Sequence, residues 1–247
     1  MKNRFELLLY TSSEKQILLG KSIGIVFLLD LFFYQSLWAL IPLSIIGFLY
    51  YRMEKKLLGH KKREEIREQF KELMLLVSTG QKAGYSAENA FLSSYDQMKA
   101  LYGKDSIICQ MIQILKLGRE NSIQFTDLWK QIGRQLKVAE ISEFADIYEI
   151  SYKRSGNMAS VMEKTAEIIV HKIETDKEIR VLLSARKFEQ KIMNLMPYFI
   201  MAYISLTSPG YFNDLYHSTS GIFLMSICLF VYLTAYVISI YIISIEI

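Results

Sequence analysis

Apolar residues are concentrated toward the two ends of this 247-residue chain, and charged residues are concentrated between them, from Arg52 to Lys191. The stretch from Gly221 to Ile245 contains no charged residue and is longer than the ~20 residues that a helix needs to cross a bilayer core. The stretch from Ile192 to Leu206 is apolar apart from Asn194, and the turn sequence Thr207-Ser208-Pro209-Gly210 follows it. This pattern predicts two membrane-spanning helices joined by a short loop.

A second apolar region, from Ile17 to Tyr51, is too long for one span and barely long enough for two. Its only polar interruption is Tyr34-Gln35-Ser36, so one long helix and two short helices are both open. Thr11 and Glu14 have the spacing of a capping box, which favours a helix start just before the region. We expect two short helices that form a hairpin, because basic residues occur on both flanks of the region.

The distribution of basic residues predicts the direction of the spans, because Lys and Arg are enriched on the cytoplasmic side of membrane proteins. The densest basic stretch follows Tyr51 and contains Arg52, Lys55, Lys56, Lys61, Lys62, Arg63 and Arg67. Lys2 and Arg4 precede the first apolar region, whereas the loop from Ser208 to Ser220 has no Lys or Arg. We therefore expect the two termini and the central section to be cytoplasmic and the loop to be outside.

Between Glu64 and Glu189, apolar residues recur at helical spacing in six stretches, which predicts six amphipathic helices. The six stripes are Ile66, Phe70, Leu73, Met74 and Val77; Ala87, Ala90, Phe91, Tyr95 and Met98; Ile108, Met111, Ile112 and Leu115; Phe125, Leu128, Trp129, Ile132 and Leu136; Val138, Ile141, Phe144, Ala145, Tyr148 and Tyr152; and Val161, Met162, Thr165, Ile168, Ile169 and Ile173. Each stripe must be buried against another, so the helices should form an antiparallel bundle. The predicted fold is all-α, with four transmembrane helices and a six-helix cytoplasmic bundle.

Two segments of the central section share a turn pattern in which a glycine follows one helix and a small polar residue precedes the next. We expect Gly84 and Gly156 to adopt the left-handed conformation that ends a helix. Ser86 and Asn157 would then cap the helices that follow. The four residues are interpreted as structural caps of two similar helical hairpins, although two ordinary helix turns would give the same pattern.

Charge and motifs give no indication of catalysis. From Arg52 to Lys191 there are 25 Lys and Arg against 20 Asp and Glu, a net charge of +5, which is too mild an excess to indicate nucleic-acid binding. The sequence has no phosphate-binding loop, no dinucleotide fingerprint and no Cys-x-x-Cys pair. Its three histidines lie in separate regions, and neither Cys109 nor Cys228 has metal-ligand spacing. We expect no catalytic residue, no cofactor and no metal site, and hence no enzyme.

Four basic residues are candidate contacts with an acidic partner surface or with anionic lipid: Lys61, Lys62, Arg63 and Arg67. The general bias of cytoplasmic flanks explains the same residues without any partner. Within the first apolar region, Lys21 is close enough to the cytoplasmic end to extend to the headgroups, and Asp30 lies near the expected outer turn. For both residues we favour these positions over a role in transport.

The order of features is two spans, a basic stretch, a helical cytoplasmic domain and two further spans. Together with the sequences Gln69–Leu73, Ala83–Phe91 and Ser155–Glu163, and with Pro197 in the third span, this order resembles the type II secretion F family. One F domain is present rather than two, which is similar to the inner-membrane platform proteins of Tad (Flp-type) pili. The resemblance extends over nearly the whole chain, and its motifs are structural.

The expected organisation has four parts. Residues 1–51 form an N-terminal segment and a transmembrane hairpin, 52–63 a basic cytoplasmic linker, 64–191 the F-type helical domain, and 192–247 the C-terminal transmembrane hairpin. The resemblance implies a scaffold in the cytoplasmic membrane of a bacterium or archaeon, which couples a cytoplasmic assembly ATPase to the insertion or extraction of pilin subunits. Its implied partners are the ATPase, pilins, a paralogous platform protein and membrane lipid, in a homo- or hetero-oligomer.

A small four-helix transporter or channel component is the alternative function. Such a protein would usually place polar residues inside several spans, whereas the last span here is uniformly apolar. An intramembrane peptidase would need paired aspartates or a Ser/His pair at membrane depth, and Asp30 is the only acidic residue inside a predicted span. The sequence therefore favours the scaffold.

Overall fold

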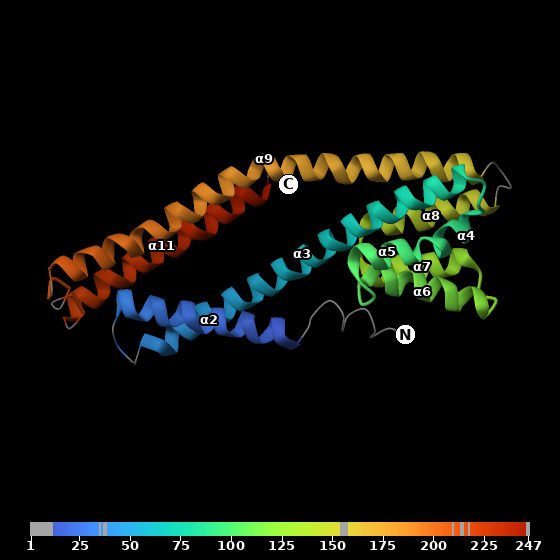
Figure 1. Cartoon of the computed structure of the whole chain (residues 1–247). Helices are drawn as coiled ribbons and strands as arrows, with labels where there is room; N and C mark the ends of the chain where they lie inside the picture. Colours follow the sequence, from blue (N-terminus) through green and yellow to red (C-terminus); the bar gives the residue numbers. More distant parts are fainter. Residues whose placement is uncertain are drawn as a thin grey trace. The chain divides into compact units, whose positions relative to one another are not determined.

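The computed structural model describes residues 12–34, 36, 39–153, 158–208, 210–212, 215–216 and 218–245. In this part of the chain every regular element is a helix, which confirms the all-α prediction (Figure 1). The chain divides into two compact units. We call residues Lys56–Asp176 the bundle unit, and Ser13–Lys55 together with the chain from Lys177 onward the apolar unit.

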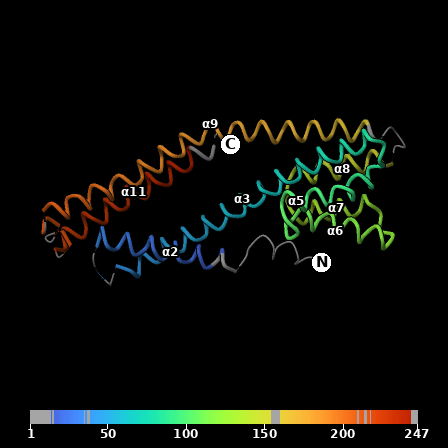
Figure 2. Tube along the Cα trace, in the orientation of Figure 1, coloured from blue at the N-terminus to red at the C-terminus, as the bar shows by residue number. Residues whose placement is uncertain are grey.

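Two long helices contribute to both units. Helix α3 extends over Leu40–Lys82 and helix α9 over Met158–Thr207, and each passes the boundary between the units without a loop. The tube in Figure 2 follows both helices along the chain. The apolar unit is completed by α2 (Ser12–Phe33) and α11 (Thr219–Ile245). The sequence between Ile17 and Tyr51 therefore forms parts of two helices rather than one.

The bundle unit contains five further helices, α4 (Ala87–Ser93), α5 (Tyr95–Tyr102), α6 (Ile107–Glu120), α7 (Phe125–Leu136) and α8 (Ala139–Lys153). The second predicted stripe thus lies on two short helices instead of one, and the prediction of six helices is not confirmed. The break has a local cause at Ser94. Its hydroxyl and its N–H both donate to the Ala90 carbonyl, at 2.7 and 3.3 Å, and such side-chain bonds compete with the regular helical ladder.

The core of the bundle unit is aromatic. Trp129 of α7 lies 4.7 Å from Phe144 of α8 and 4.9 Å from Phe91 of α4, measured between ring centroids. Phe70 of α3 packs edge-to-face on both Trp129 and Phe144. Most residues of the predicted stripes are buried in this core, which accounts for the helical spacing in the sequence.

Two stripe residues depart from the prediction. Tyr152 of α8 and Ile168 of α9 are exposed, whereas Tyr148 and Ile169 on the same helices are buried. Tyr152 lies in the last turn of α8, and Ile168 precedes Ile169 by one residue, which turns it about 100° away from the core. The period of 3.6 residues therefore predicted the buried faces of α8 and α9 correctly, but it added one exposed residue to each of these two stripes.

The connection from α3 to α4 has the geometry of a Schellman motif. Gly84 has a φ of 93°, its N–H donates to the Gln81 carbonyl at 2.9 Å, and the Tyr85 N–H donates to the Gly80 carbonyl at 3.1 Å. The Ser86 hydroxyl then accepts from the Asn89 N–H at the start of α4. The other expected caps, Gly156 and Asn157, lie outside the described residues.

In the apolar unit, helices pack through a small apolar core and a few polar contacts. The core contains Leu29, Phe33, Leu43, Met225 and Leu229, from α2, α3 and α11. Helices α2 and α3 approach closely at Gly47, where an added Cβ would lie 2.5 Å from Val26 Cγ2, and the Ser22 hydroxyl donates to the Gly47 carbonyl at 2.7 Å. Tyr232 of α11 donates to the Asn194 carbonyl of α9 at 3.0 Å.

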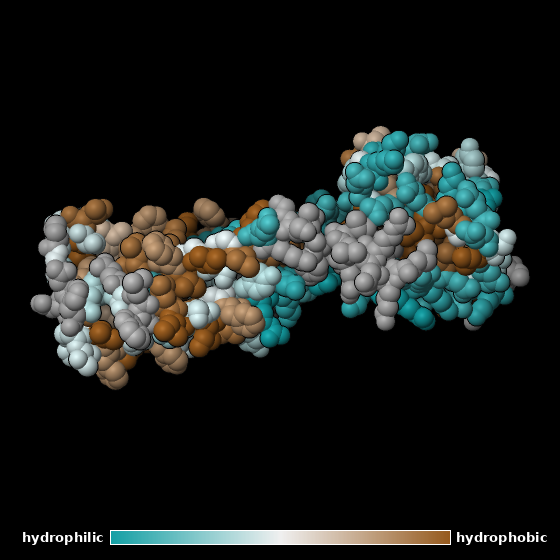
Figure 3. Space-filling model, turned by 90° about the horizontal axis from the view of Figure 1, so that it is seen from below, coloured by the Kyte–Doolittle hydropathy of each residue, from teal (hydrophilic) through white to brown (hydrophobic). Residues whose placement is uncertain are grey.

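The outside of the apolar unit is covered by large apolar side chains (Figure 3). Helix α2 over Gln16–Phe33 and helix α11 over Thr219–Ile242 are long and apolar enough to cross a bilayer, and only 17% of each is buried. The core helix of a water-soluble protein would bury most of its apolar residues. Length, composition and exposure together are consistent with a membrane protein.

Candidate functional site

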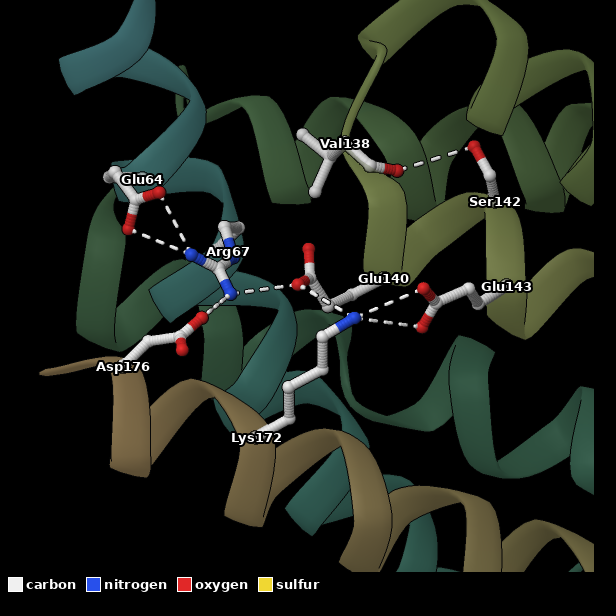
Figure 4. A network of polar contacts seen from close by, with 8 residues as sticks. All are labelled: Glu64, Arg67, Val138, Glu140, Ser142, Glu143, Lys172 and Asp176. Carbon is white, nitrogen blue, oxygen red and sulfur yellow. Dashed lines mark hydrogen bonds and ion pairs between the residues drawn. The ribbon is translucent and has the colours of Figure 1, made fainter. Parts of the chain in front are cut away.

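A cluster of charged side chains joins three helices of the bundle unit (Figure 4). Glu64 and Arg67 lie one turn apart on α3, Glu140 and Glu143 lie near the start of α8, and Lys172 and Asp176 lie on α9. Residues far apart in the sequence therefore meet in one network. We call these six residues the charged cluster.

Arg67 is the centre of the charged cluster. One terminal nitrogen, Nη1, donates to both Glu64 carboxylate oxygens at 2.9 and 3.1 Å. The other, Nη2, donates to Glu140 Oε1 at 2.7 Å and to Asp176 Oδ2 at 2.6 Å. The side chain of Arg67 is only 12% exposed, and the planar guanidinium can bind three carboxylates at once because it presents several donors in a fixed geometry.

Glu140 connects Arg67 to a second base. Its side chain is 3% exposed, and the same Oε1 atom lies 3.6 Å from Lys172 Nζ. Lys172 Nζ also donates to Glu143 at 3.0 and 3.2 Å. A buried carboxylate is costly unless it is paired, so Glu140 depends on the cations that α3 and α9 bring to it.

The chain places Glu140 through a tight turn between α7 and α8. Lys137 ends α7 in the left-handed conformation with a φ of 53°, and α8 begins two residues later. Gly133 allows the close approach, since a Cβ there would lie 3.1 Å from the Ser142 hydroxyl. The Ser142 hydroxyl donates to the Val138 carbonyl at 3.3 Å (Figure 4). Glu140 is then in the first turn of α8, where the helix dipole favours a negative charge.

A second set of ion pairs continues the contact between α3 and α9. Lys71, one turn after Arg67, is 10% exposed and lies 3.4 Å from Glu72, 3.7 Å from Glu68 and 3.7 Å from Glu174 of α9. The two sets together contain the bases Arg67, Lys71 and Lys172. Their carboxylates are Glu64, Glu68, Glu72, Glu140, Glu143, Glu174 and Asp176. The two sets thus contain three bases and seven acids, within a section that is basic overall.

The carboxylates hold the bases in their charged forms. Burial opposes the charge on Arg67, but the hydrogen bonds that Arg67 donates to Asp176 and Glu64 outweigh it and raise the pKa of Arg67 above its ordinary value. The pKa of Lys172 is raised mainly by its hydrogen bond to Glu143. Both bases therefore stay protonated, and the arrangement is suited to holding helices together rather than to exchanging protons near neutral pH.

Only part of this site was expected from the sequence. Arg67 was grouped with Lys61, Lys62 and Arg63 as a contact for a partner or lipid. Its guanidinium instead binds carboxylates within the bundle unit. Only the other three, which precede it on α3, are kept as candidate surface contacts. Glu140, Lys172 and Asp176 were missed, because pairing between separate helices leaves no periodic signal. One signal was present: Glu64, Arg67, Glu68 and Lys71 alternate in sign at helical spacing along α3.

Within the part of the chain that the structure describes, no group of three or more His, Cys, Asp or Glu side chains could hold a metal ion. Comparisons with protein-family models, with curated proteins and with solved structures found no match to this chain. Any assignment of function therefore depends on the sequence and on the geometry above.

Proposed function

We propose that the protein is an inner-membrane platform of a type II secretion or Tad (Flp-type) pilus assembly system. In this proposal the bundle unit is cytoplasmic and receives an assembly ATPase, and the apolar unit lies in the membrane and contacts pilin subunits. The protein itself is a scaffold without catalytic activity. It transmits movement from the assembly ATPase, on the cytoplasmic side, to pilin subunits that are held in the bilayer.

One observation carries the proposal: α3 and α9 each belong to both units and cross between them as helix. A helix has a fixed rise and hydrogen-bonds every turn internally, so it transmits displacement better than a flexible loop. The charged cluster ties α3 and α9 to α8, on α9 at Asp176, the last residue of the bundle unit, and on α3 at Arg67, about three turns inside the boundary at Lys56. A force on the bundle would thus reach both helices together.

The proposed topology has four spans. Helices α2 and α11 provide two of them, over Gln16–Phe33 and Thr219–Ile242. The start of α3 and the end of α9 provide the other two, supported by exposed apolar side chains such as Ile45 and Phe199. Polar contacts between helices, such as Tyr34 with Ser226 at 2.8 Å, are typical of membrane bundles, where water does not compete for them.

We propose that the ATPase binds the bundle unit near Lys61, Lys62 and Arg63. Charges at the rim of an interface mainly set the encounter rate and the salt dependence of binding. These residues lie on α3, one to two turns before Arg67, so a partner bound there would act directly on a helix that continues into the apolar unit.

The experiment is co-purification of the cognate assembly ATPase with the detergent-solubilised full-length protein at low salt. Reversing Lys61, Lys62 and Arg63 to Glu should reduce the captured ATPase by about an order of magnitude, as expected when several interface charges change sign. The matched control is Lys99→Glu, Lys104→Glu and Lys116→Glu, three exposed lysines on or between α5 and α6. Equal capture by both triple variants would contradict this docking site.

A single observation favours the alternative, a transporter or channel component. Asp30 lies in α2, and its buried Oδ1 has no hydrogen-bond partner among the described residues. Intramembrane acids often belong to ion or proton pathways. Asp30→Asn distinguishes the two functions, since a platform should assemble fibres normally with this substitution and a proton-coupled transporter should lose activity.

A further inference from the structure

We propose that the turn of α9 over residues 193–197 is a hinge, and that the hydroxyl of Tyr232 on α11 stabilises it in its helical form. We call these five residues the hinge turn. The hinge lets the part of α9 before Met193 change direction while the part after Pro197 stays in place. The proposal concerns the apolar unit alone and does not depend on the proposed function.

The hinge turn is a weak point of α9 because it contains a proline. The helix continues without interruption over Met158–Thr207, and Pro197 lies inside it. Proline has no N–H, so the Met193 carbonyl, four residues earlier, loses its helical donor, and the proline ring crowds the same carbonyl. Sharp bends in long helices are found at such positions. Pro42 has no comparable effect, because it lies in the first turn of α3, where N–H groups have no helical acceptor.

Helix α11 supplies an additional hydrogen bond to the hinge turn. The Tyr232 hydroxyl donates to the Asn194 carbonyl at 3.0 Å, and Asn194 directly follows Met193. A carbonyl oxygen has two lone pairs, so it can accept from Tyr232 and from its own helix at the same time. Side chains of neighbouring helices commonly compensate for a proline in a membrane-spanning helix. The Tyr232 bond therefore stabilises α9 at the turn that Pro197 weakens.

Aromatic contacts hold both the Tyr232 side chain and the part of α9 that follows the hinge turn. The rings of Tyr232 and Tyr198 pack edge-to-face, with their centroids 5.5 Å apart and an interplanar angle of 85°. Tyr198 also lies 5.6 Å from Phe32 of α2, measured between ring centroids. Met201, about one turn further along α9, packs against the core of the apolar unit. The part of α9 after Pro197 is thus anchored to its neighbours.

The part of α9 that precedes the hinge turn is more loosely packed. Residues 177–192 belong to the apolar unit, and each of them is exposed or half-buried. Few buried apolar contacts are typical of segments with low local stability. A helix that is packed more tightly on one side of a proline than on the other can change direction there without disrupting a core.

The experiment is hydrogen exchange of backbone amides, measured by mass spectrometry on the full-length protein in detergent. Tyr232→Phe keeps the ring and removes the hydroxyl. It should make exchange over residues 194–201 about two- to tenfold faster, as expected when one neutral hydrogen bond no longer opposes local opening. The matched control is Tyr203→Phe, which removes the hydroxyl of a side chain on α9 that is 68% exposed. Its exchange rates should stay within about twofold of wild type.

A second substitution tests whether the hydroxyl acts on the turn that the proline weakens. Pro197→Ala restores the missing N–H and should slow exchange over residues 194–201 below the wild-type rate. In the Pro197→Ala background, Tyr232→Phe should change the rate by less than about twofold, because the complete helical ladder no longer depends on the added bond.

Four results would overturn the hinge. They are unchanged exchange in Tyr232→Phe, exchange that Pro197→Ala does not slow, an equal effect of Tyr232→Phe with proline and with alanine at position 197, and faster exchange that extends over residues 221–242 of α11. The last two would show that Tyr232 only supports the packing of α11 on α9. The ATPase capture experiment has no bearing on these rates, so the hinge and the proposed function can fail separately.

Discussion

The bundle unit and the apolar unit use the same element, a long helix, in opposite ways. In the bundle unit, α3 turns Phe70, Leu73 and Met74 inward, and its largely buried bases Arg67 and Lys71 are paired with carboxylates. In the apolar unit, the same helix exposes Ile41, Ile45 and Phe48. The first pattern is typical of a helix surrounded by water, and the second is consistent with a helix surrounded by lipid. The contrast in exposed side chains is the basis for proposing different surroundings for the two units.

The largest expected effect comes from the aromatic core. Phe144→Ala should destabilise the bundle unit by about 3–5 kcal/mol, because the residue is fully buried between Trp129, Phe70 and Phe91. Phe230→Ala, at a side chain that is 71% exposed on α11, should change the stability of the bundle by far less. Thermal unfolding followed by Trp129 fluorescence measures the difference. Equal destabilisation by both variants would remove the contrast between the units.

The charged cluster should give the next largest effect. Glu140→Ala leaves Arg67 and Lys172 without their shared buried partner and should cost about 3 kcal/mol. Glu143→Ala removes a carboxylate that is 52% exposed, so its expected cost is below ~1 kcal/mol. Urea unfolding of the two variants in the same detergent compares them. If Glu143→Ala proves the more harmful, Glu140 is not the residue that joins the helices.

A smaller effect is expected at the turn between α3 and α4. Gly84→Val should cost about 1–2 kcal/mol, because a β-branched residue resists the positive φ of 93°. An added Cβ would meet nothing within 4 Å, so the cost arises from the backbone alone. Gly84→Asn is the control, since asparagine tolerates this conformation, and it should unfold close to wild type. If Gly84→Asn lost as much stability as Gly84→Val, the positive φ would not be the cause of the loss.

The smallest effect concerns acid stability. Hydrogen bonds from Lys130 and Lys153 lower the pKa of Glu149 to about 2 from an ordinary value of 4.5. A carboxylate with a lowered pKa stabilises the fold above its unfolded pKa, and this contribution is lost as the pH falls from 4.5 toward 2. Glu149→Gln should therefore be slightly less stable than wild type at pH 6 and equally stable near pH 2. Circular dichroism of denaturant unfolding at both pH values tests this, and a constant difference would rule it out.

Much of the fold was predictable because packing against a core imposes a period of 3.6 residues. The stripes through Phe70, Trp129 and Phe144 gave the helices and most of the core, and the Gly84 turn was readable from residue type. The break at Ser94 was not, because a serine inside a helical pattern is common and its effect depends on local hydrogen bonds. Apolar composition predicted four spans; two helices, α2 and α11, are long and apolar enough to cross a membrane, and the other two spans are not confirmed.

The charged cluster was less predictable than the fold. Glu140 looks like an ordinary surface residue in the sequence, and its burial follows from where α7 ends and how closely Gly133 lets α8 approach. Arg67 looked like one more residue of a basic stretch. Which charged side chains are buried depends on how α3, α8 and α9 pack against one another. The sequence carries no pattern that predicts this packing.

The central claim is that one unit lies in the membrane and the other lies entirely on one side of it. Cysteines placed at Lys61 and Ser220, both exposed, in the Cys228→Ala background test it most directly with a membrane-impermeant maleimide. We predict that the Ser220 position is labelled in intact cells and that the Lys61 position is labelled only after the membrane is opened, because the basic flank should be cytoplasmic. Labelling of both positions from the same side would contradict the four-span arrangement.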